Sequence, residues 1–175
     1  TTNDSGAISI LNPLFSYRDV VLDTDTQGDI TVQAIKSFTG SIDIESDFGS
    51  IDLLDGLESA GTIQLRAGSN VTHTESEVRM ANDTWLVTDA TSGSGDIRVS
   101  AIGNIALENL VASGYGGRAN DVFINATQGD INLNGIVDAK SSDYSRIGIT
   151  AQSGRISMTS TASLNAYGHV DLNAG

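Results

Sequence analysis

The sequence contains no cysteine, only 9 basic residues against 22 acidic ones, and no long run of apolar residues. The absence of cysteine excludes disulfide scaffolds, thiolate metal sites and cysteine catalysis, and it leaves the redox compartment open. No segment approaches the roughly 18 apolar residues of a membrane span, so we expect no membrane-spanning segment. A net charge of −13 with few, scattered Lys and Arg argues against nucleic-acid binding, because phosphate contacts require clustered basic side chains.

The residues that are abundant favour strands and turns over helices. Lys and Glu are scarce, whereas Asp, Asn, Ser, Thr and the 19 Gly are plentiful. Counted together with glycine, the apolar residues approach the share found in globular proteins, so the chain can bury a core. The composition therefore indicates many short strands joined by turns.

One motif, Gly-x-Ile-x-apolar, recurs along the chain. Its nine copies begin at Gly6, Gly28, Gly40, Gly49, Gly61, Gly95, Gly103, Gly129 and Gly154. Residue frequencies predict roughly half of one such match, so chance does not explain the repeat. Apolar and polar residues alternate within each copy, as in Ile42 to Glu45, which is typical of a half-buried strand. The glycine in front supplies a tight corner.

Other strands are expected between the copies of the motif, without a leading glycine. They fall at residues 20–23, 85–88, 122–125, 147–150 and 170–173. Together with the motif strands, they suggest that strands come in pairs along the chain.

The spacing of the motif predicts the architecture. Gly28 to Gly49 spans 21 residues and Gly129 to Gly154 spans 25, whereas a meander would need hairpin turns between neighbouring strands. The sequence therefore predicts an all-β fold, a right-handed parallel β-helix (β-solenoid) of about seven to eight coils with about 21–25 residues per coil. At about 4.8 Å per coil the rod would be roughly 35 to 40 Å long. The same register predicts that Glu45 stacks on Arg66 and Asp43 on Gln64.

Several segments resemble a known family of repeats. These are residues 28–34, 95–101 and 129–135, which begin with Gly-Asp-Ile, and residues 169–175, which share the alternation of apolar and polar residues with Asn and Ala. They resemble the repeat region of filamentous haemagglutinin-type adhesins, and the resemblance covers nearly the whole chain. It implies a secreted bacterial surface or matrix protein whose solenoid forms a stiff shaft. The amino-terminal secretion domain of that family has no match in this sequence.

We expect residues 1–175 to form a single β-solenoid segment. Neither end carries a capping pattern, which leaves two alternatives: a piece of a longer repeat protein, or a fibre subunit that stacks end to end with copies of itself. Insertions are expected near residues 68–93, 112–120 and 138–146, and specificity in repeat proteins usually lies in such insertions.

The candidate ligand-binding residues are aromatic, with one arginine. Trp85, the only tryptophan, would anchor a contact surface, since aromatic residues dominate recognition surfaces. Tyr115 and Arg118 lie in the second insertion and Tyr144 in the third. Tyr115, Tyr144 and Tyr167 could line one face and stack against sugars, although a tyrosine at a corner can also simply cover the core. Surface glycans or other cell-surface proteins would be the partners.

Catalytic and metal sites have weaker support in the sequence. Polysaccharide-degrading enzymes also use parallel β-helices and paired carboxylates. The candidate pairs are Asp23 with Asp25, Asp43 with Glu45, and Asp52 with Asp55. The motif points most polar residues outward, so these carboxylates are equally the solvated side of strands. With only two histidines we expect no metal site and no cofactor, and loosely bound calcium is the alternative.

These observations predict a non-catalytic structural or adhesive segment of a bacterial extracellular surface or matrix protein. The alternatives are a carbohydrate-binding β-helix module and, with less support, a polysaccharide-degrading enzyme.

Overall fold

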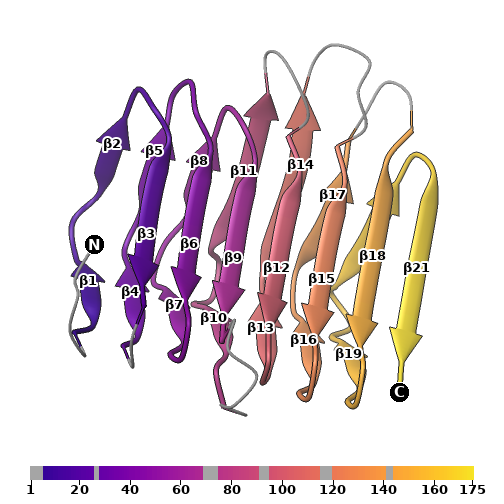
Figure 1. Cartoon of the computed structure of the whole chain (residues 1–175). Helices are drawn as coiled ribbons and strands as arrows, with labels where there is room; N and C mark the ends of the chain where they lie inside the picture. The colour runs from indigo at the N-terminus through magenta and orange to yellow at the C-terminus, as the bar shows by residue number, and fades with distance from the viewer. Residues whose placement is uncertain (1–5, 26–27, 69–74, 91–94, 115–119, 141–143) are drawn as a thin grey trace.

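The chain forms a parallel β-solenoid in a computed structural model that describes residues 6–25, 28–68, 75–90, 95–114, 120–140 and 144–175. The regular elements of these residues are 21 strands in three parallel seven-stranded sheets. Each coil gives one strand to each sheet, and the coils stack side by side from the N-terminal to the C-terminal end (Figure 1). The predicted β-solenoid is confirmed. No helix in the described part of the chain is long and apolar enough to cross a membrane.

The sheets are numbered here by their first strand. Sheet 1 contains β1 (Ile8–Ile10), β4 (Ile30–Val32), β7 (Ile51–Leu53), β10 (Val78–Met80), β13 (Ile105–Leu107), β16 (Ile131–Leu133) and β19 (Ile156–Met158). Sheet 2 contains β2 (Leu14–Ser16), β5 (Ile35–Ser37), β8 (Leu57–Ser59), β11 (Trp85–Ala90), β14 (Asn109–Gly114), β17 (Ile136–Ala139) and β20 (Ser163–Ala166). Sheet 3 contains β3 (Val20–Thr24), β6 (Ile42–Ser46), β9 (Ile63–Ala67), β12 (Ile97–Ala101), β15 (Val122–Ala126), β18 (Arg146–Ala151) and β21 (His169–Ala174).

The prediction that strands come in pairs is wrong, because each coil contains three. The glycine motif supplies strands of sheets 1 and 3, and the strands of sheet 2 lack it. In the first coils, each strand of sheet 2 has only three residues and turns one apolar side chain and one serine inward, as Ile35 and Ser37 do in β5. Ser37 is satisfied there because its hydroxyl donates to the carbonyl of Arg18 at 2.9 Å. A strand with a single inward apolar residue carries almost no periodic signal.

The register fixes the length of each coil. Ile30 pairs with Ile51 and Ile131 with Ile156, which gives coils of 21 and 25 residues in sheet 1. The longest step in sheet 3 runs from Ile63 to Ile97, 34 residues along the chain. The coils at the N-terminal end are therefore the most regular, and the longer steps begin after β9.

The interior consists of ladders of Ile, Leu, Val and Ala that run through all three sheets. Equivalent inward residues stack on one another, as Ile42, Ile63 and Ile97 do in sheet 3, and each of these three is fully buried. Burial of such side chains from water is worth about 1.5–3 kcal/mol each and supplies most of the drive to fold. The predicted interior is confirmed.

The polar residue that follows the motif glycine has a defined role at the corners. Asp29 accepts a hydrogen bond from the backbone N–H of Ser50 in the next coil at 2.8 Å. Asp130 does the same for Arg155 at 2.8 Å, and the Asp96 carboxylate accepts from the N–H of Asp121 at 3.0 Å. These side chains satisfy amide groups just before the strands begin, so each coil fixes the register of the next.

The motif glycines allow the corners to stack closely. A Cβ at Gly129 would lie only 2.2 Å from the carbonyl carbon of Gly103 in the preceding coil. A Cβ at Gly49 would lie 2.3 Å from the carbonyl oxygen of Gly28. Glycine is required at these positions by the close approach of two backbones.

Candidate functional site

The predicted ligand-binding residues do not form one cluster in the structure. Trp85 begins β11 on the outer face of sheet 2, with 43% of its surface exposed. Tyr144 and Tyr167 lie instead at the corner between sheets 2 and 3 in the last two coils, where the backbone N–H of Tyr167 donates to Ser145 Oγ at 3.0 Å. Tyr115 and Arg118 lie outside the described residues. Of the three tyrosines in the predicted row, the structure therefore describes only Tyr144 and Tyr167.

The ring of Tyr144 is packed against its neighbours. It meets the imidazole of His169 edge to face, with 5.4 Å between ring centroids. The guanidinium of Arg146 lies 5.9 Å from its centroid, and a Cβ at Gly168 would lie 3.1 Å from its Cε1 atom. Tyr144 thus has neighbours at this corner and is still 46% exposed, while Tyr167 is 74% exposed.

Sequence reasoning missed an aromatic cluster on the outer face of sheet 2. Tyr17 and Phe38 stack with centroids 4.9 Å apart, and Phe15 lies 6.4 Å from Phe38. All three are exposed, Phe15 and Tyr17 strongly so. The signal that could have found them is the 21-residue step from Tyr17 to Phe38, which is the length of one coil. Because the predicted fold did not place Tyr17 and Phe38 on a common sheet, this spacing did not indicate that the two rings are neighbours.

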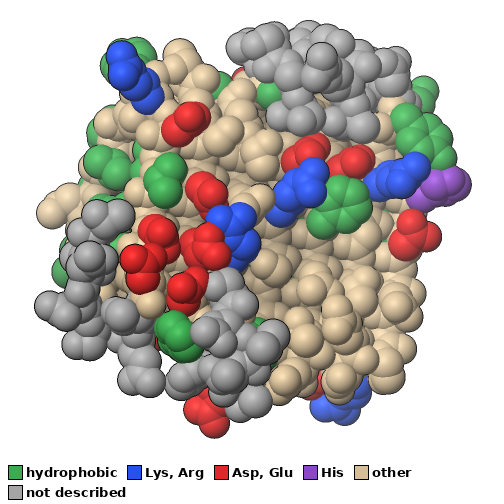
Figure 2. Space-filling model, in the orientation of Figure 1, with side chains coloured by type: hydrophobic (Ala, Val, Ile, Leu, Met, Phe, Trp, Pro, Cys, Tyr) green, Lys and Arg blue, Asp and Glu red, His purple; other side chains and the backbone are tan. Residues whose placement is uncertain are grey.

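The outer face of sheet 3 carries mainly charged side chains, with the ring of Phe123 beside Arg98 on its later coils. Acidic side chains gather over β3 and β6 on the face shown in Figure 2, with basic side chains beside them. Arg66 of β9 forms ion pairs with Glu45 and, at 3.3 Å, with Asp43. Glu45 pairs with Arg66 and Asp43 with Gln64 in the strand register, so the predicted stacking across this coil boundary is confirmed.

The acidic surface shifts the pKa of one carboxyl group. Partial burial, followed by the negative charges of Asp25 and Glu45, raises the pKa of Asp23 above its ordinary value. Two carboxylates on one strand face, such as Asp43 and Glu45, are here held by a shared guanidinium. The pairing serves to neutralise stacked charges between coils, which is a structural use of these groups.

The third pair of candidate carboxylates is also engaged. Asp52 accepts hydrogen bonds from Arg79 at 2.7 and 3.4 Å, and this contact raises the pKa of the Arg79 guanidinium. Asp55 accepts the backbone N–H of Gly56 at 2.7 Å, as a turn residue does. These two acids have different partners and do not act as a pair.

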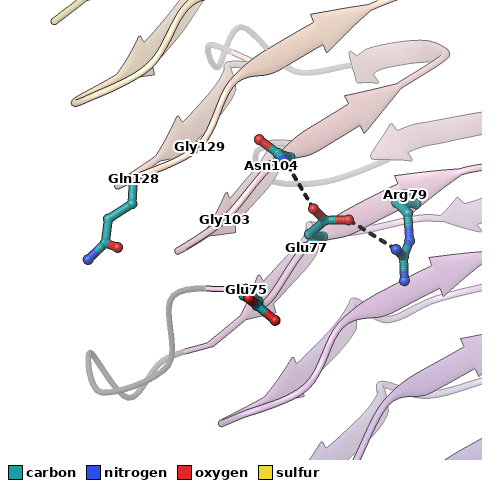
Figure 3. Close-up of a pocket in the computed structure, with 7 residues that line it drawn as sticks. All are labelled: Glu75, Glu77, Arg79, Gly103, Asn104, Gln128 and Gly129. Carbon is teal, nitrogen blue, oxygen red and sulfur yellow. Dashed lines mark hydrogen bonds and ion pairs between the residues drawn. The ribbon is translucent and has the colours of Figure 1, made fainter.

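A polar hollow of about 510 Å³ lies next to Arg79 at the corner where the chain enters sheet 1. Glu77 occupies its centre, where its carboxylate accepts from Arg79 at 3.0 Å and from the side-chain amide of Asn104 at 2.7 Å (Figure 3). Glu75 and Gln128 border the opening. The bonded chain of Asn104, Glu77 and Arg79 joins adjacent coils. Among the described residues no group of three or more His, Cys, Asp or Glu is arranged to hold a metal ion.

The fold and repeat define the chain as a parallel β-solenoid. No protein-family model matches it, and comparisons with curated proteins and with solved structures give no match. Function is therefore inferred from the chain's own residues and geometry.

Proposed function

We propose that the chain is a non-catalytic structural segment of a bacterial extracellular surface or matrix protein, where it serves as a stiff adhesive shaft or as the building block of a surface fibre. Its partners are neighbouring repeats or further copies of itself, end to end, and molecules on the surfaces to which it adheres. It needs no cofactor for this role. The resemblance of its Gly-Asp-Ile repeats to filamentous haemagglutinin-type adhesins supports the bacterial and extracellular part of the proposal.

The observation that carries the proposal is the unbroken register of the three sheets. All seven strands of each sheet are parallel and hydrogen-bonded to their neighbours. In sheet 3 five residue pairs join β12 to β15, and five join β15 to β18. A force along the solenoid axis therefore loads the hydrogen bonds of a coil boundary together, and bending must distort three sheets at once. Such a body suits load bearing.

The engagement of the outer carboxylates supports the non-catalytic part. General acid and base catalysis needs a carboxyl group that is free to exchange a proton with substrate. Asp43, Glu45 and Asp52 are instead held by arginines in ion pairs. These ion pairs link adjacent coils, and the second oxygen of Asp43, Oδ1, is buried without a hydrogen-bond partner.

Force spectroscopy on single molecules tests the load-bearing role. A chain held by handles at its two ends is expected to resist extension and then to release one coil at a time. The step from Ile131 to Ile156 is 25 residues, so each event adds about 85 Å of extended chain. Smooth extension at low force, without discrete steps, would contradict the role of a stiff shaft.

A viscosity assay tests the absence of catalysis. Solutions of neutral and acidic polysaccharides are expected to keep their viscosity on prolonged incubation with the protein. A progressive fall for any of them that disappears in an Arg66→Ala or Glu45→Gln variant would overturn the non-catalytic proposal and direct attention to the charged face of sheet 3.

A further inference from the structure

The outer face of sheet 2 is hollowed over its third coil. The strand β8 presents only Glu58 outward, and the residues that flank it on the same face are Gly56 and Ala60. Ala60 lies between the larger side chains Phe38 and Asp89 of the neighbouring coils. A trough of about 360 Å³ results, with Phe38 and Lys36 on one wall, Val87 and Asp89 on the other, and Glu58 and Ala60 in its floor.

The ring of Phe38 lines this trough and is 41% exposed. The backbone N–H of Phe38 donates to the carbonyl of Ser16, and the N–H of Ala60 donates to the carbonyl of Ser37. These hydrogen bonds between coils place Tyr17, Phe38 and Ala60 in one row. Tyr17 covers one side of the Phe38 ring, at 4.9 Å and an interplanar angle of 26°. On the other side the row continues with the single methyl group of Ala60. The row of stacked rings thus ends in an open position, one coil wide, into which another flat group fits.

Trp85 lies on the same outer face, two residues before Val87 along β11 and beyond the residues that line the trough. Leu86 pairs with Leu57, so Trp85 lies beside Gly56, where an added Cβ would be 3.0 Å from the Trp85 carbonyl oxygen. The two walls of the trough are two strand spacings, or roughly 9.6 Å, apart, and the outer face of β8 runs four residues, or about 13 Å, from Ala60 to Gly56. Phe38 therefore lies in the wall of the trough, and Trp85 lies beyond its other end.

The polar groups of the trough can both donate and accept hydrogen bonds. Lys36 forms an ion pair with Glu58, and its ammonium group lies 5.5 Å from the Phe38 centroid. Asp89 adds an exposed carboxylate on the far wall. A ligand that carries hydroxyl groups around apolar ring faces would find partners for both kinds of surface.

Other ligand classes fit this trough less well. A peptide cannot add as a strand, because the amides of sheet 2 are used in its own ladder and its outer face offers side chains alone. Anionic ligands meet Glu58, Asp89 and a net charge of −13. A cation would compete with Lys36, which already occupies the position beside the Phe38 ring.

We propose that this trough binds a neutral oligosaccharide of two or three units, with Phe38 and Trp85 as stacking platforms and Lys36, Glu58 and Asp89 as hydrogen-bonding partners of its hydroxyl groups. The site differs from the predicted tyrosine row, although it shares Trp85 with the predicted ligand-binding residues. The assignment of this saccharide as the adhesive partner of the shaft rests on the proposed function.

Titration followed by fluorescence tests the site, because Trp85 is the only tryptophan of the chain and lies on the same outer face, beyond one end of the trough. The probes are neutral gluco-, galacto- and N-acetylglucosamine oligosaccharides of one to four units, together with a hexa-arginine peptide and an acidic uronic-acid oligomer. At least one neutral series is expected to shift the emission saturably, with affinity rising up to two or three units. Absence of any such shift, or a saturable shift with only the peptide or the acidic oligomer, overturns the proposal.

Two variants locate the binding. Phe38→Ala is expected to weaken it about tenfold or more, since it removes one stacking platform. Ala60→Tyr continues the row of rings into the open position and is expected to block binding while leaving the thermal unfolding temperature close to that of the parent. Phe123→Ala removes an outward aromatic ring from β15 in sheet 3 and serves as the matched control with unchanged affinity. Unchanged binding in both trough variants overturns the assignment, whereas the force measurement above bears on the shaft alone.

Discussion

The outer faces of sheets 2 and 3 differ although the interior behind them is the same. Behind sheet 2 stack Leu57, Leu86 and Leu110, and behind sheet 3 stack Ile63, Ile97 and Val122, all fully buried. Outside, sheet 2 carries exposed rings and a trough, whereas sheet 3 carries acids and arginines that pair between coils.

The comparison separates what the fold requires from what it leaves free. Every second residue of a strand must fill the ladder, and the corner residues must allow close stacking. The outward residues are limited only by solubility and by charge along the row. Differences between outer faces are therefore the place to look for function in a solenoid, and the trough of sheet 2 with Phe38 in its wall is one such difference.

The largest expected effect tests whether the interior is equivalent behind both faces. Leu110→Ala in sheet 2 and Ile124→Ala in sheet 3 each remove a buried ladder side chain and should each lower the free energy of unfolding by about 2–5 kcal/mol. Denaturant unfolding measures both. Asn125→Ala, whose side chain points outward on β15, is the control and should change it by less than about 0.5 kcal/mol. A loss confined to one sheet would mean that the two sheets do not share one core.

The next effect distinguishes a corner from an outer face. Gly129→Ala places a methyl group against the backbone of Gly103 and is expected to cost about 1–3 kcal/mol of unfolding free energy. Gly148→Ala, on the outer face of sheet 3, meets only the ring of Phe123 at 3.1 Å, which can move aside. The unfolding free energy measured by calorimetry should be clearly lower for Gly129→Ala than for Gly148→Ala. Equal effects would contradict the role of glycine in corner stacking.

The charge pairs of sheet 3 are expected to contribute little. A double-mutant cycle of Arg66→Ala with Glu45→Ala should give a coupling free energy of about 0.2–1 kcal/mol, because both side chains are partly exposed. The coupling should shrink in 0.5 M salt. A double-mutant cycle on the outer face of sheet 2, Lys36→Ala with Glu58→Ala, should give a coupling free energy in the same range and with the same salt dependence. A salt-independent coupling well above this range would show that the pair is shielded from solvent.

The smallest expected effects are changes in unfolding temperature, which have opposite signs at Asp130 and Asp23. The N–H of Arg155 lowers the pKa of Asp130, so this group stabilises the fold above the unfolded pKa of about 4 and loses that contribution as pH falls through the folded value. Burial and nearby acids raise the pKa of Asp23, so its contribution is present below about pH 4 and is lost as pH rises through the folded value. Asp130→Asn should therefore lower the unfolding temperature at pH 7 and Asp23→Asn should raise it, and both differences should shrink as the pH falls through the folded pKa of each carboxyl group. Shifts of the same sign at pH 7 would contradict these assignments.

Most of the fold was predictable because two of the three sheets carry the glycine motif. The motif at Gly40 and Gly61 is sufficient to align Glu45 with Arg66, and the structure has that pair. The strand predicted at residues 85–88 is β11 of sheet 2, but the sheet as a whole was missed because its first strands hold one apolar residue each, with serines such as Ser37 and Ser59 turned inward. Those serines are stabilised by carbonyl groups of the preceding coil, which no periodicity reveals.

The trough could not be predicted from the sequence for a related reason. Its walls come from coils of different length, since Phe38 to Ala60 is 22 residues and Ala60 to Asp89 is 29. Only the three-dimensional register aligns them. Trp85 was predicted on the basis of residue type alone, whereas its placement beside Gly56 depends on the long step between β8 and β11.

The most direct test of a stiff parallel solenoid is a distance between spin labels on the outer face of sheet 3. Asp43→Cys and Asp171→Cys introduce the only thiols of the chain at equivalent positions of β6 and β21, five coil steps apart. Pulsed electron resonance should give one narrow distribution centred near 24 Å, five rises of about 4.8 Å, adjusted for the label arms. A broad distribution, or a narrow one at a clearly different distance, would contradict the account.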